Sequence, residues 1–308
     1  QSRSSAASDV YKRQALAHGS FFAIGATVAA RLAPPGQASR AISLMFAGLT
    51  LAMVIGVPLG SLIGNVLGWR LPFFAVAALA ALAWLATARW VPVLGTPAAG
   101  NARAQLAALC CVPILAMMAV TVCGFGASFA AFTFITPILT GITGFSVHTA
   151  NLLLVVFGVA TMMGNLAGGR WAARLGWPLA LQRMLVGVVL VLAMLALALP
   201  WQWAMVPLLF AWGVLAFGLS PGCQAGMLDT AQRWTPHALD FASALNIAAF
   251  NLGITLGEAL GSALVARQQL AWTPWAGVVL AALALGPLWW LSRRLARPAA
   301  RVMAQRHD

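Results

Sequence analysis

The chain has 308 residues, of which 62% are apolar and only 7% are charged. Soluble globular proteins carry roughly 25% charged residues, so this composition excludes a soluble protein and favours one that lies in a lipid bilayer. The net charge is +13, but the arginines stand singly between apolar runs and do not gather on one surface. We therefore expect the lipid bilayer to be the partner of this positive charge, and we expect no nucleic acid.

The first fourteen residues differ from everything that follows. Residues 1–14 hold the only Tyr and the only Lys of the chain, and they lack the apolar core of a signal peptide. We interpret residues 1–14 as a non-native leader and leave them out of the fold prediction.

Nine apolar stretches follow, each long enough to cross a bilayer as a helix, which needs roughly 20 residues. They predict an all-α polytopic membrane protein. The longest connection, 89–106, is rich in Pro and Gly, so we expect it to link two bundles. The predicted spans are 16–33, 41–67, 71–88, 108–137, 149–169, 178–199, 203–226, 241–265 and 272–292.

The loops between these spans alternate in arginine content. One side of the membrane receives thirteen arginines and the other receives only Arg70 and Arg267. Basic residues in short loops are retained in the cytoplasm, so the 89–106 linker and a basic tail over 293–308 are expected there. Nine spans then place a basic N-terminus outside, against the same rule, which indicates that spans are missing upstream.

A repeat relates two of the predicted spans. Residues 56–70 (GVPLGSLIGNVLGWR) and 253–267 (GITLGEALGSALVAR) share three aligned glycines, and each copy ends in one of the two exceptional arginines. Each copy also lies on the second-to-last span of its bundle. Some transporters are built from parallel repeats of six spans. The register therefore predicts about nine of twelve spans: a remnant of the first bundle over 15–88 and a complete second bundle over 107–292.

Several segments resemble one branch of the major facilitator superfamily, the drug:proton antiporter 1 branch, which includes arabinose-efflux-like and purine-ribonucleoside-efflux-like permeases. They are HGSFFAIGATVAARLAPP (18–35), FAAFTFITPILTGITGFS (129–146), GNLAGGR (164–170) and ALNIAAFNLGITLG (244–257). The resemblance implies the major facilitator fold, with 15–88 as spans four to six and 107–292 as spans seven to twelve.

Two glycine motifs correspond to family motifs. The first motif has a glycine at every fourth position, Gly56, Gly60 and Gly64, so a neighbouring helix can approach closely. It resembles the branch's antiporter motif. The second motif, which runs from Gly164 to Arg174, resembles a gating motif of the family whose aspartate and arginines bridge helices. In this chain the position of that aspartate holds Ala173, which puts the salt bridge in doubt. Ordinary helix packing and positive-inside anchoring explain the same residues. The gating and packing residues are Gly56, Pro58, Gly60, Gly64, Gly164, Gly168, Gly169, Arg170 and Arg174.

Glu258 is the one carboxylate that falls deep in a predicted span. An ionised group in hydrocarbon is costly, so such residues face a cavity or a partner. Glu258 is our candidate for proton coupling, and the alternative is a water-facing or partnered acid with no coupling role. The other acids of the body, Asp229 and Asp240, flank Arg233, which indicates local ion pairing.

Polar and aromatic residues on several spans are candidates to line a central substrate cavity. Helix-helix hydrogen bonding and core packing explain them equally well. They are Phe129, Thr133, Thr136, Asn151, Gln224, Asn246 and Asn251.

The sequence thus predicts a proton-coupled exporter of a small organic molecule such as a drug, sugar or nucleoside, acting as a monomer in the bacterial inner membrane. A fragment unable to transport is the first alternative. The second, a membrane enzyme, rests on Gly218-Leu219-Ser220-Pro221-Gly222, which fits a hydrolase motif but lacks the strand that the motif requires. We expect no catalytic residue, cofactor or metal.

Overall fold

The computed structural model describes residues 14, 20–22, 24–56, 59–60, 63–64, 67–92 and 102–304. Within these ranges every regular element is a helix. Seven of the described helices are long and apolar enough to cross a membrane. The prediction of an all-α polytopic membrane protein is confirmed.

The first part of the chain contributes few described elements. A shorter apolar helix runs over Ser20–Leu32. Helix α2 (Ala38–Leu51) continues into a π-helical turn, η1 (Ala52–Gly56), and α4 spans Arg70–Trp90. A short helix, α5 (Ala102–Leu109), overlaps the end of the segment predicted to link two bundles (89–106) and continues into the following predicted span.

The second part contains six long helices that correspond to the last six predicted spans. Four short elements connect them: α7 (Ile135–Pro137), the π-helix η2 (Ile138–Ile142), and the 3-10 helices η3 (Pro236–Ala238) and η4 (Leu270–Trp272). The long helices are α6 (Val112–Phe132), α8 (Val147–Leu175), α9 (Trp177–Leu197), α10 (Gln202–Trp234), α11 (Leu239–Ala266) and α12 (Thr273–Ala304).

Several boundaries differ from the prediction for local reasons. Helix α6 begins at Val112 and not at 108, because Cys111 is extended and Pro113 fits only the first turn of a helix. Helix α10 continues two turns past the predicted end at 226. Helix α12 continues to Ala304 and so includes most of the basic tail predicted over 293–308.

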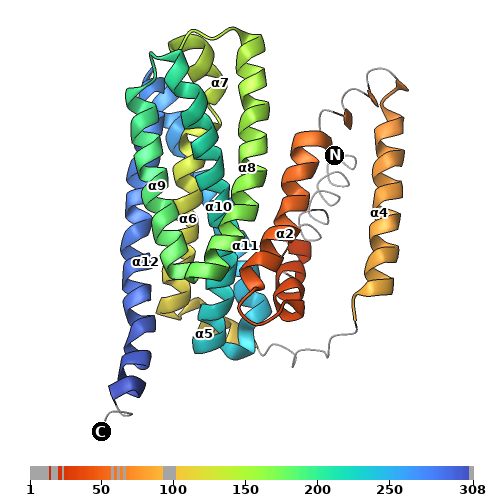
Figure 1. Cartoon of the computed structure of the whole chain (residues 1–308), viewed down its shortest axis with the longest axis vertical. Coiled ribbons are helices and arrows are strands. Elements are labelled where there is room, and N and C mark those ends of the chain that lie inside the picture. Colours follow the sequence, from red (N-terminus) through yellow and green to blue (C-terminus); the bar gives the residue numbers. More distant parts are fainter. Residues whose placement is uncertain are drawn as a thin grey trace, which may run out of the picture.

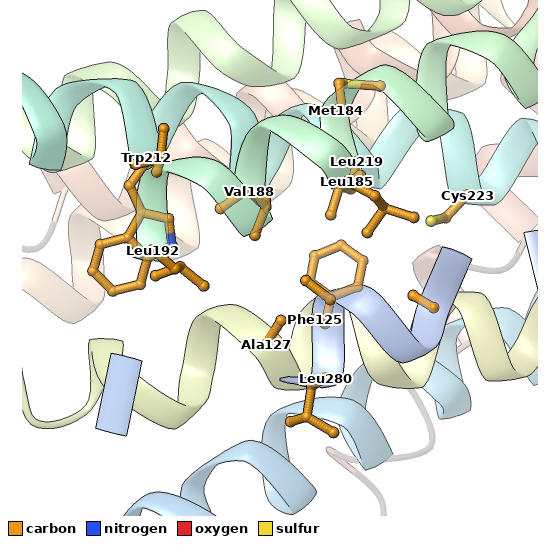
Figure 2. Close-up of a cluster of buried hydrophobic side chains, with 14 of the residues drawn as sticks. Phe125, Ala127, Met184, Leu185, Val188, Leu192, Trp212, Leu219, Cys223 and Leu280 are labelled. Atoms are coloured by element: carbon orange, nitrogen blue, oxygen red, sulfur yellow. The ribbon is translucent and has the colours of Figure 1, made fainter. Parts of the chain in front are cut away.

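The core of the second part lies between α6, α9, α10 and α12. Figure 2 shows Phe125 of α6 facing Leu185 and Val188 of α9, with Leu219 of α10 above it and Leu280 of α12 below. These side chains are buried. They hold α6, which is central in this bundle, against three neighbours.

The first part contacts this bundle through α2, while α4 stands apart (Figure 1). Phe22 and Phe46 stack with their ring centroids 5.5 Å apart, and the pair packs against Ala225 and Leu228 of α10. By contrast, α4 has no buried residue among the described part of the chain. The contact between the two parts is therefore made by α2 and the Ser20–Leu32 helix.

Candidate functional site

Helices α6 and α11 approach each other at the second copy of the glycine repeat. A Cβ atom added at any of the three glycines would collide with backbone of α6, so only glycine permits this approach. The pairs are Gly253 with the carbonyl oxygen of Val122, Gly257 with that of Gly126, and Gly261 with that of Ala130. Close helix packing is therefore present at the second copy of the repeat, whereas the sequence predicts such packing for the first copy.

The first copy of the repeat looks different in the residues that are described. Nothing lies within 4 Å of a Cβ added at Gly60, and Gly64 has only ordinary contact with Pro72. Gly56 ends the π-helical turn and is exposed. Pro58 lies outside the described residues. Among the described residues, the only helix near this glycine face is α4, which reaches Gly64 through Pro72 at ordinary contact distance.

The glycines of α8 join two other helices. Gly164 and Gly168 pack on the backbone of Val214 and Gly218 in α10, and Gly169 packs on Ser43 at the start of α2. A side chain at any of these positions would force the helices apart. Gly169 is thus a point of close contact between the second bundle and the first part of the chain.

A buried polar network connects α6, α10 and α11. The Asn246 side-chain amide donates to Gln224 Oε1 at 2.6 Å, and Gln224 Nε2 donates to Ser243 Oγ at 2.6 Å. The Thr121 hydroxyl donates to Asn246 Oδ1 at 2.7 Å. All four side chains are buried. Two predicted cavity residues, Gln224 and Asn246, are therefore brought together, bonded to one another inside the bundle.

Thr121 and Ser243 were missed as site residues when the sequence was considered alone. Ser243 lies three residues before Asn246, so the two share one helix face. That spacing was a usable signal. Thr121 carried none, because its partner Asn246 is 125 residues away in the chain.

A second polar group lies on the more open side of α6 and α11. The Thr133 hydroxyl donates to Glu258 Oε1 at 3.2 Å. Asn251, Thr255 and Glu258 follow one another at helical spacing on α11, and the first two are exposed. The structure therefore places two predicted cavity residues, Thr133 and Asn251, on the same surface as the candidate coupling acid.

The remaining cavity candidates lie elsewhere. Phe129 makes an edge contact with Phe132, which stacks on Phe157 with ring centroids 4.8 Å apart. Thr136 is half-buried beyond the end of α6, and Asn151 is exposed about one turn into α8. These residues do not join the buried network.

One end of the bundle carries the arginines of the gating motif. Arg170 and Arg174 are exposed at the end of α8 and flank Ala173. They line a cavity of about 430 Å³ together with residues at the start of α2. Asp229 of α10 is the acidic residue nearest to Arg174 in the sequence. Its carboxylate forms a salt bridge with Arg233 at 3.1 Å and accepts a hydrogen bond from the Trp177 indole at 3.0 Å. The local pairing predicted for Asp229 is confirmed.

The hydrolase-like pentapeptide lies inside α10. Ser220 is buried, Gly218 packs on α8, and Pro221 is within the helix. His237 follows in the short helix η3, beyond the end of α10. The segment thus acts as a helix-packing element.

Long apolar helices, close glycine contacts and polar groups kept between helices are typical of a multi-span integral membrane protein. A family model for the Major Facilitator Superfamily matches residues 14–233. The chain belongs to this superfamily.

Curated relatives support the same assignment. The chain is 38% identical over 265 residues to the "Uncharacterized MFS-type transporter YtbD" of Bacillus subtilis (strain 168), covering 85% of this chain and 66% of that protein. It is 34% identical over 275 residues to the "Inner membrane transport protein YdhP" of Escherichia coli (strain K12), covering 88% of this chain and 68% of that protein. The chain therefore spans about two thirds of the length of these relatives, both of which are named as transporters.

Proposed function

We propose that this chain provides the second bundle of a proton-coupled carrier that exports a small organic molecule. The observation that carries the proposal is the polar surface formed by Thr133, Asn251, Thr255 and Glu258 on α6 and α11. A carboxylate in a membrane span faces a cavity, water or a partner. Among the described residues, the hydrogen-bond partner of the Glu258 carboxylate is the neutral hydroxyl of Thr133.

The mechanism that fits these residues is alternating access, in which two bundles rock about a central site. We assign to Glu258 the binding and release of the coupled proton, and to Asn251 and Thr133 the hydrogen bonds that orient a polar substrate. The buried network around Gln224 and Asn246 keeps α6, α10 and α11 together as one rigid body during that motion. The resemblance to the drug:proton antiporter 1 branch supports outward transport.

The proposed carrier lies in the bacterial inner membrane with the end of α12 in the cytoplasm. The arginine distribution supports this orientation, and a relative named as an inner membrane transport protein supports the location. We further propose that the activity belongs to a monomeric protein of the relatives' full length, in which additional spans complete the first bundle.

The test is Glu258→Gln in the full-length protein reconstituted into liposomes. Gln keeps a hydrogen-bond acceptor for Thr133 but cannot release a proton, so substrate movement driven by a pH gradient should fall to the level seen without the gradient. Substrate exchange without a gradient should continue. The panel of substrates is one sugar, one nucleoside and one cationic drug.

The matched control is Asp240→Asn, which removes an acid from the first turn of the same helix, outside the polar surface. This variant should keep gradient-driven transport. If Glu258→Gln also keeps it, Glu258 is a structural acid and the coupling assignment is wrong.

A further inference from the structure

Two adjoining cavities lie where the start of α2 meets the last turns of α8. The first, about 430 Å³, is lined by Gln37, Arg40, Arg170, Ala173 and Arg174 among others. The second, about 560 Å³, shares Gln37, Arg40 and Arg170 with the first and is otherwise mostly apolar. The arginines therefore stand at the junction of a polar space and an apolar one.

The first cavity is strongly positive. Its three arginines are exposed, and neither cavity is lined by a carboxylate. The contact described for Arg40 is a hydrogen bond of 3.4 Å to Gln37 Oε1. Among the residues that the structure describes, no Asp or Glu forms a salt bridge with Arg40, Arg170 or Arg174; the pair that is present, Asp229 with Arg233, lies on α10.

Position 173 explains why the charge is uncompensated. Ala173 lines the cavity beside Arg170 and Arg174, and the resemblance described in the sequence analysis assigns an aspartate to this position. A carboxylate there would lie beside the guanidinium groups and neutralise part of their charge. With Ala173, no carboxylate is among the residues that line this cavity, so its arginines can bind an external anion.

The apolar cavity indicates what carries that anion. Its walls include Leu32, Leu44 and Leu166, and Leu32 and Leu44 are 47% and 69% exposed. A free phosphate ion would leave this groove empty, whereas the phosphate and the acyl chain of one phospholipid would occupy both spaces. Guanidinium groups bind phosphate oxygens through charge-assisted hydrogen bonds.

We propose that Arg40, Arg170 and Arg174 bind the phosphate of an anionic phospholipid, whose acyl chain lies in the groove between Leu32, Leu44 and Leu166. The lipid bridges α2 and α8, the two helices that already meet at Gly169 and Ser43. It therefore joins the first part of the chain to the second bundle at the end where α12 also ends (Figure 1). This proposal does not depend on the coupling role given to Glu258.

The experiment is native mass spectrometry of the purified 308-residue chain in detergent, titrated with phosphatidylglycerol or with phosphatidylethanolamine of the same acyl chains. The chain should retain phosphatidylglycerol in preference to phosphatidylethanolamine. The double variant R170Q/R174Q should bind phosphatidylglycerol about tenfold more weakly, because the loss of a hydrogen bond to a charged group lowers the affinity by about that factor. The control R183Q, an exposed arginine of α9 outside both cavities, should bind like the unaltered chain.

A second variant tests the site without removing an arginine. Ala173→Asp supplies an internal carboxylate, so it should also weaken phosphatidylglycerol binding about tenfold while leaving the fold intact. If both altered proteins bind phosphatidylglycerol as the unaltered chain does, or if R183Q weakens binding as much as R170Q/R174Q, the site is not where we place it. If inorganic phosphate displaces phosphatidylglycerol at equal concentration, the site binds a free anion and the lipid assignment is wrong.

Discussion

Helices α11 and α4 are both membrane-spanning in length and composition, yet their surroundings are opposite. Helix α11 places three glycines directly on the backbone of α6, and it sends Ser243 and Asn246 into a buried network. Helix α4 has no buried residue, and Phe73, Leu79 and Trp84 on it are 68%, 65% and 70% exposed.

The difference shows that apolar composition selects a membrane location but does not select a partner. Lipid tails solvate an apolar helix as well as another helix does, so association depends on close packing and on hydrogen bonds. Helix α4 is also rich in small residues, since eight of its 21 residues are alanine. A small-residue face is therefore only a capacity for packing, and a second helix must be present to use it.

Among substitutions that test this difference between α11 and α4, the largest loss of stability is expected at Gly257. In Gly257→Leu the new side chain meets the backbone of Gly126, which cannot move aside, so α6 and α11 must separate. We expect the free energy of unfolding to fall by about 3 kcal/mol, the upper end of the usual cost of over-packing. The measurement is titration of the detergent-solubilised chain with sodium dodecyl sulfate, followed by circular dichroism.

Gly286 on α12 provides the matched control for that substitution. Nothing lies within 4 Å of a Cβ added there, so Gly286→Leu should be neutral or stabilise the helix by about 0.5–1 kcal/mol. Equal destabilisation by the two variants would show that the α6–α11 contact is not what distinguishes α11 from α4.

The next effect concerns the polar network of the packed region. Gln224→Leu leaves the Asn246 amide and the Ser243 hydroxyl without the bonds that Gln224 makes with them, at a cost of about 1–3 kcal/mol. The double variant Gln224→Leu/Asn246→Leu should cost less than the sum of the two single changes, since both ends of one bond are removed together. The same unfolding titration measures all three proteins.

Asn251 serves as the control for the network, because it lies on the same helix as Asn246 but is exposed and donates to the backbone carbonyl of Ile247. Asn251→Leu should change the unfolding free energy by less than about 0.5 kcal/mol. Strict additivity of the Gln224 and Asn246 changes would mean that their 2.6 Å bond contributes nothing to stability.

Much of the fold could be predicted because its signals are local. Runs of apolar residues predicted the long helices, and the repeat related Gly253, Gly257 and Gly261, which pack on α6, to the first glycine motif. The same spacing at Gly56, Gly60 and Gly64 indicated a neighbour that the described residues do not provide. Glycine spacing predicts that a helix face can pack closely, but which helix packs there depends on parts of the chain that are distant in sequence.

The site could be predicted only in part for the same reason. Gln224 and Asn246 stood out as amides in apolar helices, but their bond to each other depends on the rotation of α10 against α11. Thr121 joins them from 125 residues away. The arginine cavity was equally hidden, since Arg40 and Arg170 come together only when α2 packs on α8.

The smallest effect is expected for substitutions on α4. They test whether α4 lacks buried residues because of its own sequence or because the helices that would cover it are not in this chain. In the 308-residue chain, alanine substitutions at successive large residues from Phe73 to Leu85 should each change stability by less than about 0.5 kcal/mol, because none of these side chains is buried. In a protein of the relatives' full length, further spans should cover one face of α4. The substitutions should then cost about 2–3 kcal/mol at positions that recur with a period of about 3.6 residues, and remain neutral between them. A uniformly neutral scan in the longer protein would show that α4 faces lipid on every side, and the proposal that additional spans complete the first bundle around it would be wrong.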